Sequence, residues 1–198
     1  QGLEKPEGLG SSWTQKYRAW LATLCQLTQH GQGMRYALGS LLRQLNALER
    51  EILQIDGQIE ALAKEERNQP IVEELRKERG IGLLTALVYR TEIGYAGRFR
   101  RGRQVGKFHG LTPTSHESGQ QNDRKGHISR QGPPRLRKVL CQASWVHLRH
   151  DKSSRLLYDR LVHRNPKKKK IALVAVMRRL AVRLWHRMRK AELELTIA

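Results

Sequence analysis

The chain has 198 residues, with 38 Lys and Arg against 18 Asp and Glu, and a formal net charge of +20 at pH 7. This length suits one sizeable domain or two small ones, and no apolar run is long enough to span a membrane. The two cysteines, Cys25 and Cys141, lie far apart, which excludes a disulfide framework and the usual zinc-binding spacings, so we expect reduced thiols in a cytosolic protein. Because the sequence opens at Gln1 and carries no signal peptide, we expect an excerpt or a processed product.

The positive charge is concentrated in the second half of the chain. Twelve basic and twelve acidic residues precede Arg98, whereas twenty-six basic and six acidic residues lie from Arg98 onward. A field of this strength is typical of a protein that binds a polyanion, and nucleic acid is the favoured partner. An anionic membrane is the weaker alternative, because the basic segments lack aromatic anchors on one face.

The first half predicts a linker and two helices. Residues 1–12 are rich in Gly, Pro and Ser, and an apolar helical pattern follows from Trp13 to Leu27, with a break at Gly31–Gly33. A heptad seam then runs over residues 38–62 at alternating steps of three and four. Its members are Leu38, Leu41, Leu45, Leu48, Ile52, Ile55, Ile59 and Leu62.

The seam leaves two pairings open. It can zip with a second copy of the chain as a coiled coil, giving a homodimer or tetramer, or fold against the first helix as a hairpin. Pro70 ends the helix, because proline lacks the N–H and restricts the residue before it. We therefore predict two domains, a linker with a coiled coil or helical hairpin over 1–69 and a basic domain over 70–198.

A helix-hairpin-helix is predicted at the start of the basic domain. One helix is expected over Ile71–Lys77 and another over Leu83–Ile93, with Gly80 and Gly82 in the turn between them. The glycines let the backbone turn sharply and lay its N–H groups against a phosphate, helped by the N-terminus of the second helix. An ordinary tight turn between two helices is the alternative.

The rest of the chain is predicted to be mostly helical around an irregular Ser/Gly loop. Helices are expected over Arg103–Phe108, Arg135–Arg149 and Ser153–His163, and a last amphipathic helix over Lys170–Glu194. The helix over Arg135–Arg149 is expected to place its apolar side chains on one side, and these are Leu136, Val139, Leu140, Ala143, Val146 and Leu148. Strand signal is poor throughout, so the predicted fold class is mostly α. The apolar positions of the last helix recur at steps of three or four and are Leu173, Val176, Leu180, Leu184 and Met188.

Basic side chains surround the predicted loop. Between Arg98 and Lys138 eleven residues are basic and two are acidic, and the basic ones lie on both sides of the sequence TPTSHESG. Guanidinium and ammonium groups in this arrangement suit phosphate contacts. The expected nucleic-acid-binding residues, besides Gly80 and Gly82, are Arg98, Arg100, Arg101, Arg103, Lys107, Arg124, Lys125, Arg130, Arg135, Arg137 and Lys138.

One hydroxyl in this loop is a candidate nucleophile. Ser118 precedes Gly119, where the backbone can approach a nucleic-acid strand closely. Its oxygen would attack phosphorus while arginines hold the non-bridging oxygens, with His116 and Glu117 as base and orienter. On composition alone, an ordinary phosphate contact or a turn former is the more common role of such a serine. No metal-spaced His/Cys set, Walker loop or carboxylate cluster is found, so we expect no metal in this chain.

Five motifs follow one another in order between Arg79 and Trp145. They are GIG..TA, EIG....F, FHGLTP, SG and GHISRQG...LR..L..A. Together they resemble the C-terminal transposase domain of the IS-one-ten (IS116/IS902-type) insertion-sequence transposases. The resemblance covers about a third of the chain.

The resemblance implies a DNA recombinase that moves an insertion sequence. In this family a RuvC-like domain with a DEDD acidic site holds Mg²⁺, a coiled-coil segment helps to dimerise, and some members use a guide (bridge) RNA. The family's catalytic serine falls on Ser118, with Ser115 as the alternative. The implied partners are DNA and a guide RNA, in the nucleoid-associated cytoplasm of a bacterium or archaeon.

The sequence departs from the family in two ways. Arg79 stands where a proline is common, which adds a possible phosphate contact and loses a rigid turn. No RuvC-like domain is present, so we expect this polypeptide alone to bind nucleic acid without recombining it, and Mg²⁺ to bind in the missing domain. The alternatives are a non-catalytic helix-hairpin-helix module, a relic of a decayed mobile element, or an RNA-binding scaffold.

Overall fold

The computed structural model describes residues 5–10, 13–26, 31–115 and 125–197. The chain divides into two compact units between Gln58 and Ile59, inside a long helix. The sequence predicts a domain boundary between residues 69 and 70, where that helix is expected to end. The division lies earlier because Ala63 and the partly buried Ile59 belong to the apolar core of the second unit.

The first unit contains a helical hairpin. Helix α1 (Gln15–Leu24) begins after Thr14, whose side chain accepts a hydrogen bond from the amide of Tyr17, and α2 (Gln32–Lys64) begins in this unit. Arg18 pairs with Glu49 at 2.5 Å. Apolar side chains of both helices line one shared groove, among them Tyr17, Trp20, Leu21, Leu24, Leu38 and Leu41.

Part of the heptad seam on α2 faces solvent. Leu48 is 62% exposed, Ile52 is 56% exposed and Ile55 is 44% exposed. The hairpin pairing therefore exists within the chain, yet it leaves apolar positions of the seam uncovered. Pairing of these positions with a second copy stays a prediction.

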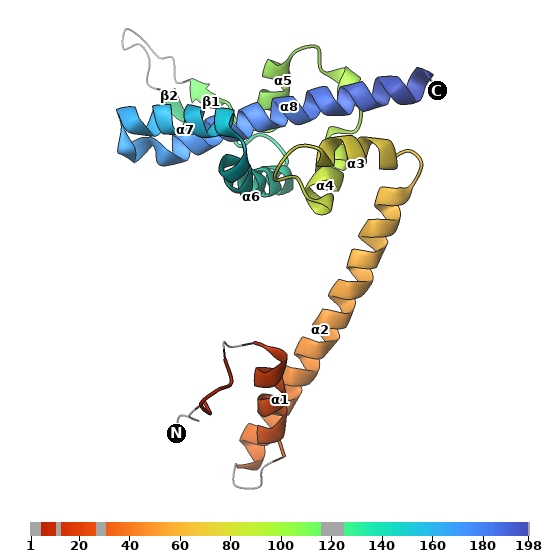
Figure 1. Cartoon of the computed structure of the whole chain (residues 1–198), viewed down its shortest axis with the longest axis vertical. Coiled ribbons are helices and arrows are strands. Elements are labelled where there is room, and N and C mark those ends of the chain that lie inside the picture. Colours follow the sequence, from red (N-terminus) through yellow and green to blue (C-terminus); the bar gives the residue numbers. More distant parts are fainter. Residues whose placement is uncertain (1–4, 11–12, 27–30, 116–124, 198) are drawn as a thin grey trace. The chain divides into compact units, whose positions relative to one another are not determined.

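The second unit is built around its last helix, α8 (Lys169–Ile197). Helices α3, α5, α6 and α7 and the short η1 and η2 turns all contact α8, and Figure 1 shows α5 on one side of it with α3 and α6 on the other. The bounds are α3 (Gln69–Arg76), α4 (Leu83–Ile93), η1 (Ala96–Arg98), α5 (Gly102–Phe108), α6 (Pro134–His150), α7 (Lys152–Arg164) and η2 (Pro166–Lys168).

The core confirms the periodicity predicted for the last helix. Its expected apolar positions, from Leu173 to Met188, are all buried. Two buried aromatic side chains also find polar partners, as buried Tyr and Trp usually do. The hydroxyl of Tyr89 donates to the carbonyl of Ala181 at 2.6 Å, and the indole of Trp185 donates to the carbonyl of Ala96 at 2.9 Å.

Helix α6 differs in part from its predicted apolar face. Leu136, Leu140 and Ala143 are buried as expected, but Val146 is exposed and His147 is fully buried in its place. Helix α6 packs against both α4 and α8, so the buried stripe is set by two neighbours rather than by one row of apolar residues. A histidine is tolerated there because its ring nitrogens have partners.

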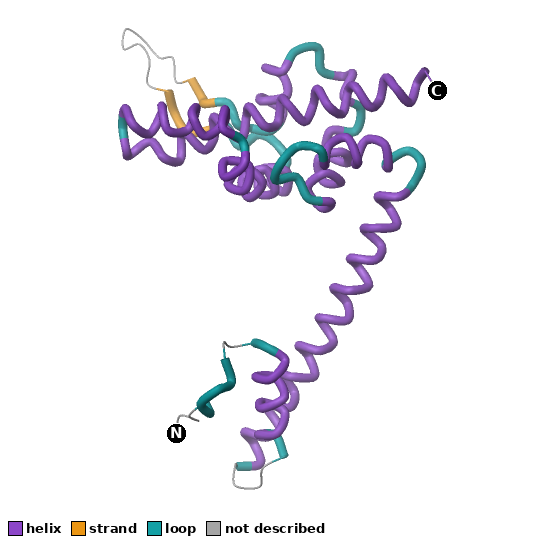
Figure 2. The backbone as a smooth tube through the Cα atoms, in the orientation of Figure 1, coloured by secondary structure: helices purple, strands orange, loops and turns teal. Residues whose placement is uncertain are grey.

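A small hairpin interrupts the helices, and the sequence did not predict it. Strands β1 (Pro113–Ser115) and β2 (Lys125–Ile128) pair antiparallel, with Pro113 opposite Ile128 and Ser115 opposite Lys125. They are the two orange segments of the tube in Figure 2. Strands of three and four residues are too short to show a clear alternation of apolar and polar side chains in the sequence. The fold class is otherwise mostly α, as predicted.

Candidate nucleic-acid interface

The predicted nucleophile belongs to the segment that joins the two strands of the hairpin. Ser118 and Arg124 fall within residues 116–124, which lie outside the described residues. The backbones of Ser115 and Lys125 pair where the strands meet this segment. The structure therefore describes the two strands on either side of the predicted loop.

Hydrogen bonds anchor the base of the hairpin. The hydroxyl of Thr114 donates to the carbonyl of His127 at 3.0 Å, and the amide of Ser129 donates to the carbonyl of Thr112 at 2.8 Å. Leu111, just before the first strand, is fully buried. The base of the hairpin is thus tied together and follows directly from the core of the second unit.

Two glycines let the chain cross itself beneath the hairpin. Gly110 has φ +65°, and a Cβ there would lie 2.8 Å from the amide nitrogen of Gln131. A Cβ at Gly132 would overlap the carbonyl oxygen of Phe108. Only glycine fits such close backbone contacts, so this crossing explains Gly110 of FHGLTP and Gly132 of GHISRQG.

Two arginines form hydrogen bonds at the same backbone crossing. Arg137 lies on α6, and Arg130 follows strand β2. One guanidinium nitrogen of Arg137 donates to the carbonyl of Gly132 at 2.5 Å and points to that of His109 at 3.4 Å. Arg130 is exposed, with a left-handed backbone at φ 54°, and its amide donates to the carbonyl of Gly110 at 3.1 Å. Arg137 therefore has a structural contact in addition to its predicted phosphate contact.

Arg98 lies over an aromatic pair. Its guanidinium carbon is 4.6 Å from the ring centroid of Phe99 and 4.4 Å from that of Phe108. A cation over two ring faces is attracted by their quadrupoles. Arg98 is still exposed, so its outer face remains available to solvent.

Most of the other predicted basic residues are exposed. The side-chain oxygen of Gln104 accepts from the amides of Arg100, at 2.7 Å, and Arg101, at 3.2 Å, which fixes the start of α5. Nothing of the side chain of Lys125 is described. The exposed predicted residues on α5, on the segment before it and at the start of α6 are Arg100, Arg101, Arg103, Lys107, Arg135 and Lys138.

The two glycines of the predicted helix-hairpin-helix have different surroundings. Gly80 has φ +87°, and a Cβ there would lie 2.9 Å from the amide nitrogen of His147 and 3.0 Å from the carbonyl oxygen of Ala143. Gly82 begins α4 with φ −86°, is exposed, and has nothing within 4 Å of such a Cβ. Gly80 thus serves packing against α6, whereas Gly82 presents bare backbone to solvent.

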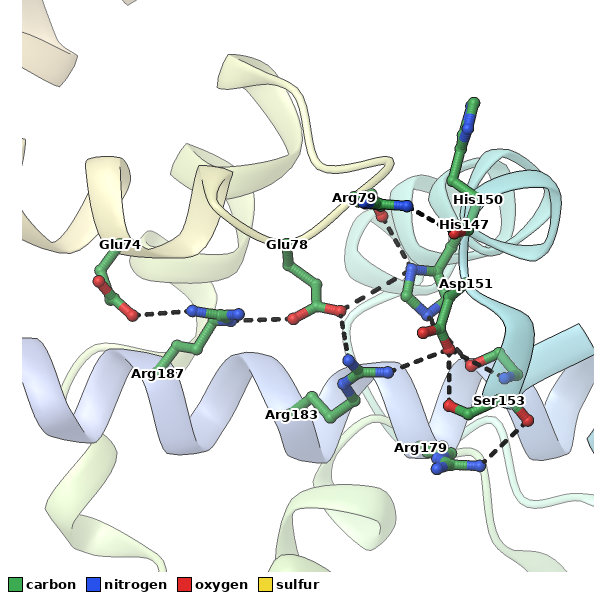
Figure 3. Close-up of polar contacts among 11 residues, drawn as sticks. Glu74, Glu78, Arg79, His147, His150, Asp151, Ser153, Arg179, Arg183 and Arg187 are labelled. Atoms are coloured by element: carbon green, nitrogen blue, oxygen red, sulfur yellow. Dashed lines mark hydrogen bonds and ion pairs between the residues drawn. The ribbon is translucent and has the colours of Figure 1, made fainter.

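A row of ion pairs neutralises two arginines of α8, as Figure 3 shows. Arg187 bonds Glu74 and Glu78, each at 2.9 Å, and Arg183 bonds Glu78 at 3.0 Å and Asp151 at 3.2 Å. Partial burial opposes ionisation of Asp151, but hydrogen bonds from its own helix and the charge of Arg183 hold its pKa well below the ordinary value. This part of α8 is therefore occupied by structural contacts.

His147 joins that row to the glycine turn. Its Nδ1 lies 2.8 Å from the carbonyl oxygen of Arg79, and its Nε2 lies 3.1 Å from the hydroxyl of Ser154 and 3.3 Å from a carboxylate oxygen of Asp151. Arg79 also donates to the carbonyl of His150 at 2.9 Å. Arg79 is thus tied to α6 by both its backbone and its side chain.

His109 is the other fully buried histidine. Its Nδ1 lies 2.6 Å from the carbonyl oxygen of Val105, and its Nε2 has no hydrogen-bond partner among the described residues. Burial lowers the pKa of His109 from 6.5 to about 4. The ring is therefore neutral at physiological pH.

The described part of the chain contains neither a metal-binding cluster nor a helix that could span a membrane. No group of three or more His, Cys, Asp and Glu could hold a metal ion there. None of the described helices is long and apolar enough to cross a membrane. Cys25 and Cys141 are free thiols.

Comparison with known proteins identifies relatives of this chain. Residues 72–159 match the model of the transposase IS116/IS110/IS902 family. "Putative transposase y4rJ" of Sinorhizobium fredii is 37% identical over 121 residues, 59% of this chain and 30% of that protein. "Transposase for insertion sequence element IS1111A" of Coxiella burnetii is 32% identical over 120 residues, 61% of this chain and 32% of that protein. The chain thus spans about a third of the length of these relatives.

Proposed function

We propose that this chain is the DNA-binding part of a transposase and supplies its serine nucleophile, Ser118, because residues 72–159 match the model of the transposase IS116/IS110/IS902 family. The proposal rests on two features that lie within the same matched segment. The family match contains the hairpin that bears Ser118 together with the exposed basic residues of α5 and the start of α6. Those side chains are suited to DNA phosphates.

DNA binding would be governed by phosphate contacts. The exposed arginines and lysines around the hairpin would release counterions from DNA, so affinity would fall steeply with salt. Gly82, with bare backbone at the start of α4, would add an amide contact to one phosphate. These contacts would position the DNA without reading its sequence.

Strand cleavage would proceed by attack of the Ser118 oxygen on phosphorus. The Oγ–P bond forms as the bond from phosphorus to one sugar oxygen breaks, the serine proton passes to a base, and the departing sugar oxygen takes up a proton. We propose His116 as the base and nearby arginines as the groups that stabilise the phosphoryl oxygens. Attack by another sugar hydroxyl on the serine phosphoester would complete strand exchange.

The metal chemistry of this family would belong to another part of the enzyme. The described residues offer no acidic cluster that fits Mg²⁺. We propose that a RuvC-like DEDD domain supplies the Mg²⁺ site and that a guide RNA selects the DNA. The exposed part of the α2 seam would join two copies of the chain as a coiled coil.

Substitution of the serine tests the proposal. In the enzyme that carries its acidic domain, Ser118→Ala should retain DNA affinity and lose the covalent protein–DNA adduct on a denaturing gel. Ser115→Ala is the matched control and should retain both. An adduct of normal yield in Ser118→Ala would reject the serine assignment, and no adduct in the wild type would favour a non-catalytic DNA-binding module.

A further inference from the structure

A groove lies between α5 and α8, with a volume of about 640 Å³. Four guanidinium groups, two glycines and two small apolar side chains line it. Of these residues only Arg103 belongs to the set predicted from the sequence to bind phosphate. The lining residues that matter here are Gly102, Arg103, Gly106, Arg178, Arg179 and Arg183.

The glycines of α5 bring the two helices close together. A Cβ at Gly102 would lie 2.8 Å from a methyl carbon of Val182 on α8. A Cβ at Gly106 would lie 3.5 Å from the Nε of Arg178, so this guanidinium lies over bare α5 backbone. The absence of side chains at both positions leaves the groove open between the arginines.

The four guanidiniums differ in how far they are neutralised. Arg183 pairs with Glu78 and Asp151, and Arg179 points to the carbonyl of Ser153 at 3.4 Å. Neither Arg103 nor Arg178 forms an ion pair with a residue that the structure describes. The groove thus carries uncompensated positive charge beside a charge-balanced row.

We propose that this groove binds the sugar–phosphate backbone of DNA through Arg103 and Arg178, with Arg179 in support. This inference rests on the proposed DNA-binding function and deepens it by naming a contact surface. Guanidinium forks match phosphate oxygens, whereas a lysine would act only as a point charge. The apolar lining offers contact to sugar carbons, and phosphate and sugar take most of the hydrogen bonds between proteins and DNA, so we assign the contact to the backbone.

The groove is connected to the hairpin through a short stretch of chain. Helix α5 ends at Phe108 and β1 begins at Pro113, so the two are separated by at most about 18 Å. A DNA strand held in the groove would therefore be fixed near the loop that carries Ser118. The groove would hold the DNA in position and would not take part in the reaction itself.

Salt-dependent binding to a fluorescent DNA duplex tests the proposal with the 198-residue chain. The groove variant is Arg103→Gln with Arg178→Gln. The matched control is Arg149→Gln with Arg160→Gln, which removes the same charge from exposed side chains of α6 and α7 outside the groove. Loss of two phosphate contacts should lower the slope of log affinity against log salt by about 2 and weaken binding at least about tenfold.

The control should weaken binding much less than the groove variant. Equal losses in the two variants would overturn the proposal, because they would reflect net charge alone. A groove variant that binds like the wild type would overturn the groove and leave the DNA-binding function standing. A wild-type chain that does not bind DNA would overturn both.

Two further arms keep the test decisive. Arg103→Gln alone changes only an exposed side chain, so it should fold normally and show about half the change in slope. An RNA duplex of the same sequence should lose less affinity than DNA in the groove variant, because the proposed chemistry acts on DNA. A loss as large or larger for RNA would overturn the assignment to DNA.

Discussion

The Nδ1 of His147 donates a hydrogen bond to the main-chain carbonyl oxygen of Arg79, 2.8 Å away. A carbonyl oxygen can only accept, so a proton lies on Nδ1, while Nε2 lies 3.1 Å from the hydroxyl of Ser154. One buried ring therefore fastens α6 and α7 to the glycine turn between α3 and α4. The position of that turn depends on the packing of α6.

The two turn glycines should respond differently to alanine. Gly80→Ala forces a side chain onto positive φ and against the backbone of α6, so it should destabilise the second unit by more than about 2 kcal/mol. Gly82→Ala should leave stability nearly unchanged, because nothing lies within 4 Å, yet it should weaken DNA binding if the bare backbone contacts a phosphate. Thermal unfolding and DNA titration measure the two effects. Unchanged DNA affinity in Gly82→Ala would argue for an ordinary turn.

The glycines of α5 offer a second matched pair. Gly102→Ala places a methyl group 2.8 Å from Val182 and should destabilise the second unit by about 1–3 kcal/mol through overpacking. Gly106→Ala makes an ordinary 3.5 Å contact inside the helix and should stabilise it by roughly 0.5–1 kcal/mol, since alanine favours helix over glycine. Unfolding followed by the fluorescence of buried Trp185 would reveal the sign of each change. Equal effects would mean that α5 does not pack on α8 as described.

Removal of the charge on Glu78 should weaken the row of ion pairs. Glu78 is 4% exposed and bonds Arg183 and Arg187, so Glu78→Gln leaves two guanidiniums without their shared partner. We expect a loss of about 2–4 kcal/mol in the free energy of unfolding. Glu66→Gln, at an exposed position, is the control and should change stability by less than about 0.5 kcal/mol. A neutral Glu78→Gln would show that the row adds no stability.

Stability should fall between pH 6.5 and pH 4 because of His109. Its pKa is about 4 in the folded chain and 6.5 as an ordinary histidine, so the unfolded state binds a proton first in this range. The sign is therefore a loss of stability as pH falls, by roughly 3 kcal/mol in total. His109→Phe should flatten this limb, while the carbonyl of Val105 keeps its bond to the backbone amide of residue 109. An unchanged limb in the variant would contradict the buried neutral ring.

A second acidic limb should appear below about pH 4. Hydrogen bonding to Lys77 and to Arg187 lowers the pKa of Glu74, against its partial burial, and the pKa of Asp151 is also lowered. These carboxylates contribute stability above their unfolded values of 4.5 and 3.8, and it is lost as they are protonated. Asp151→Asn should reduce this limb without altering the limb of His109. Equilibrium unfolding in denaturant at each pH separates the two ranges.

The sequence was sufficient where the buried positions of a helix are apolar and recur at helical spacing. The apolar positions of α8 recur in this way, and all five predicted members are buried. On α6 the same reasoning failed at Val146 and His147, because the buried position holds a histidine whose ring has a partner distant in sequence, the carbonyl oxygen of Arg79.

Parts of the candidate interface could not be derived from composition. Arg137 looked like a phosphate contact, and the structure adds a bond to the carbonyl of Gly132 that depends on a backbone crossing. The sequence around Arg178 does not indicate the groove. Arg103, which also lines it, belongs to a helix far away in sequence. Such pairings follow from tertiary contacts, which periodicity does not encode.

The residue that becomes attached to DNA tests the central claim most directly. The chain joined to the proposed acidic domain would be trapped on a nicked suicide duplex and digested with protease, and the nucleotide-bearing peptide would be sequenced by mass spectrometry. Our account predicts the phosphoester on Ser118, with the yield abolished in Ser118→Ala. Attachment at Ser115 or at any other side chain would contradict it.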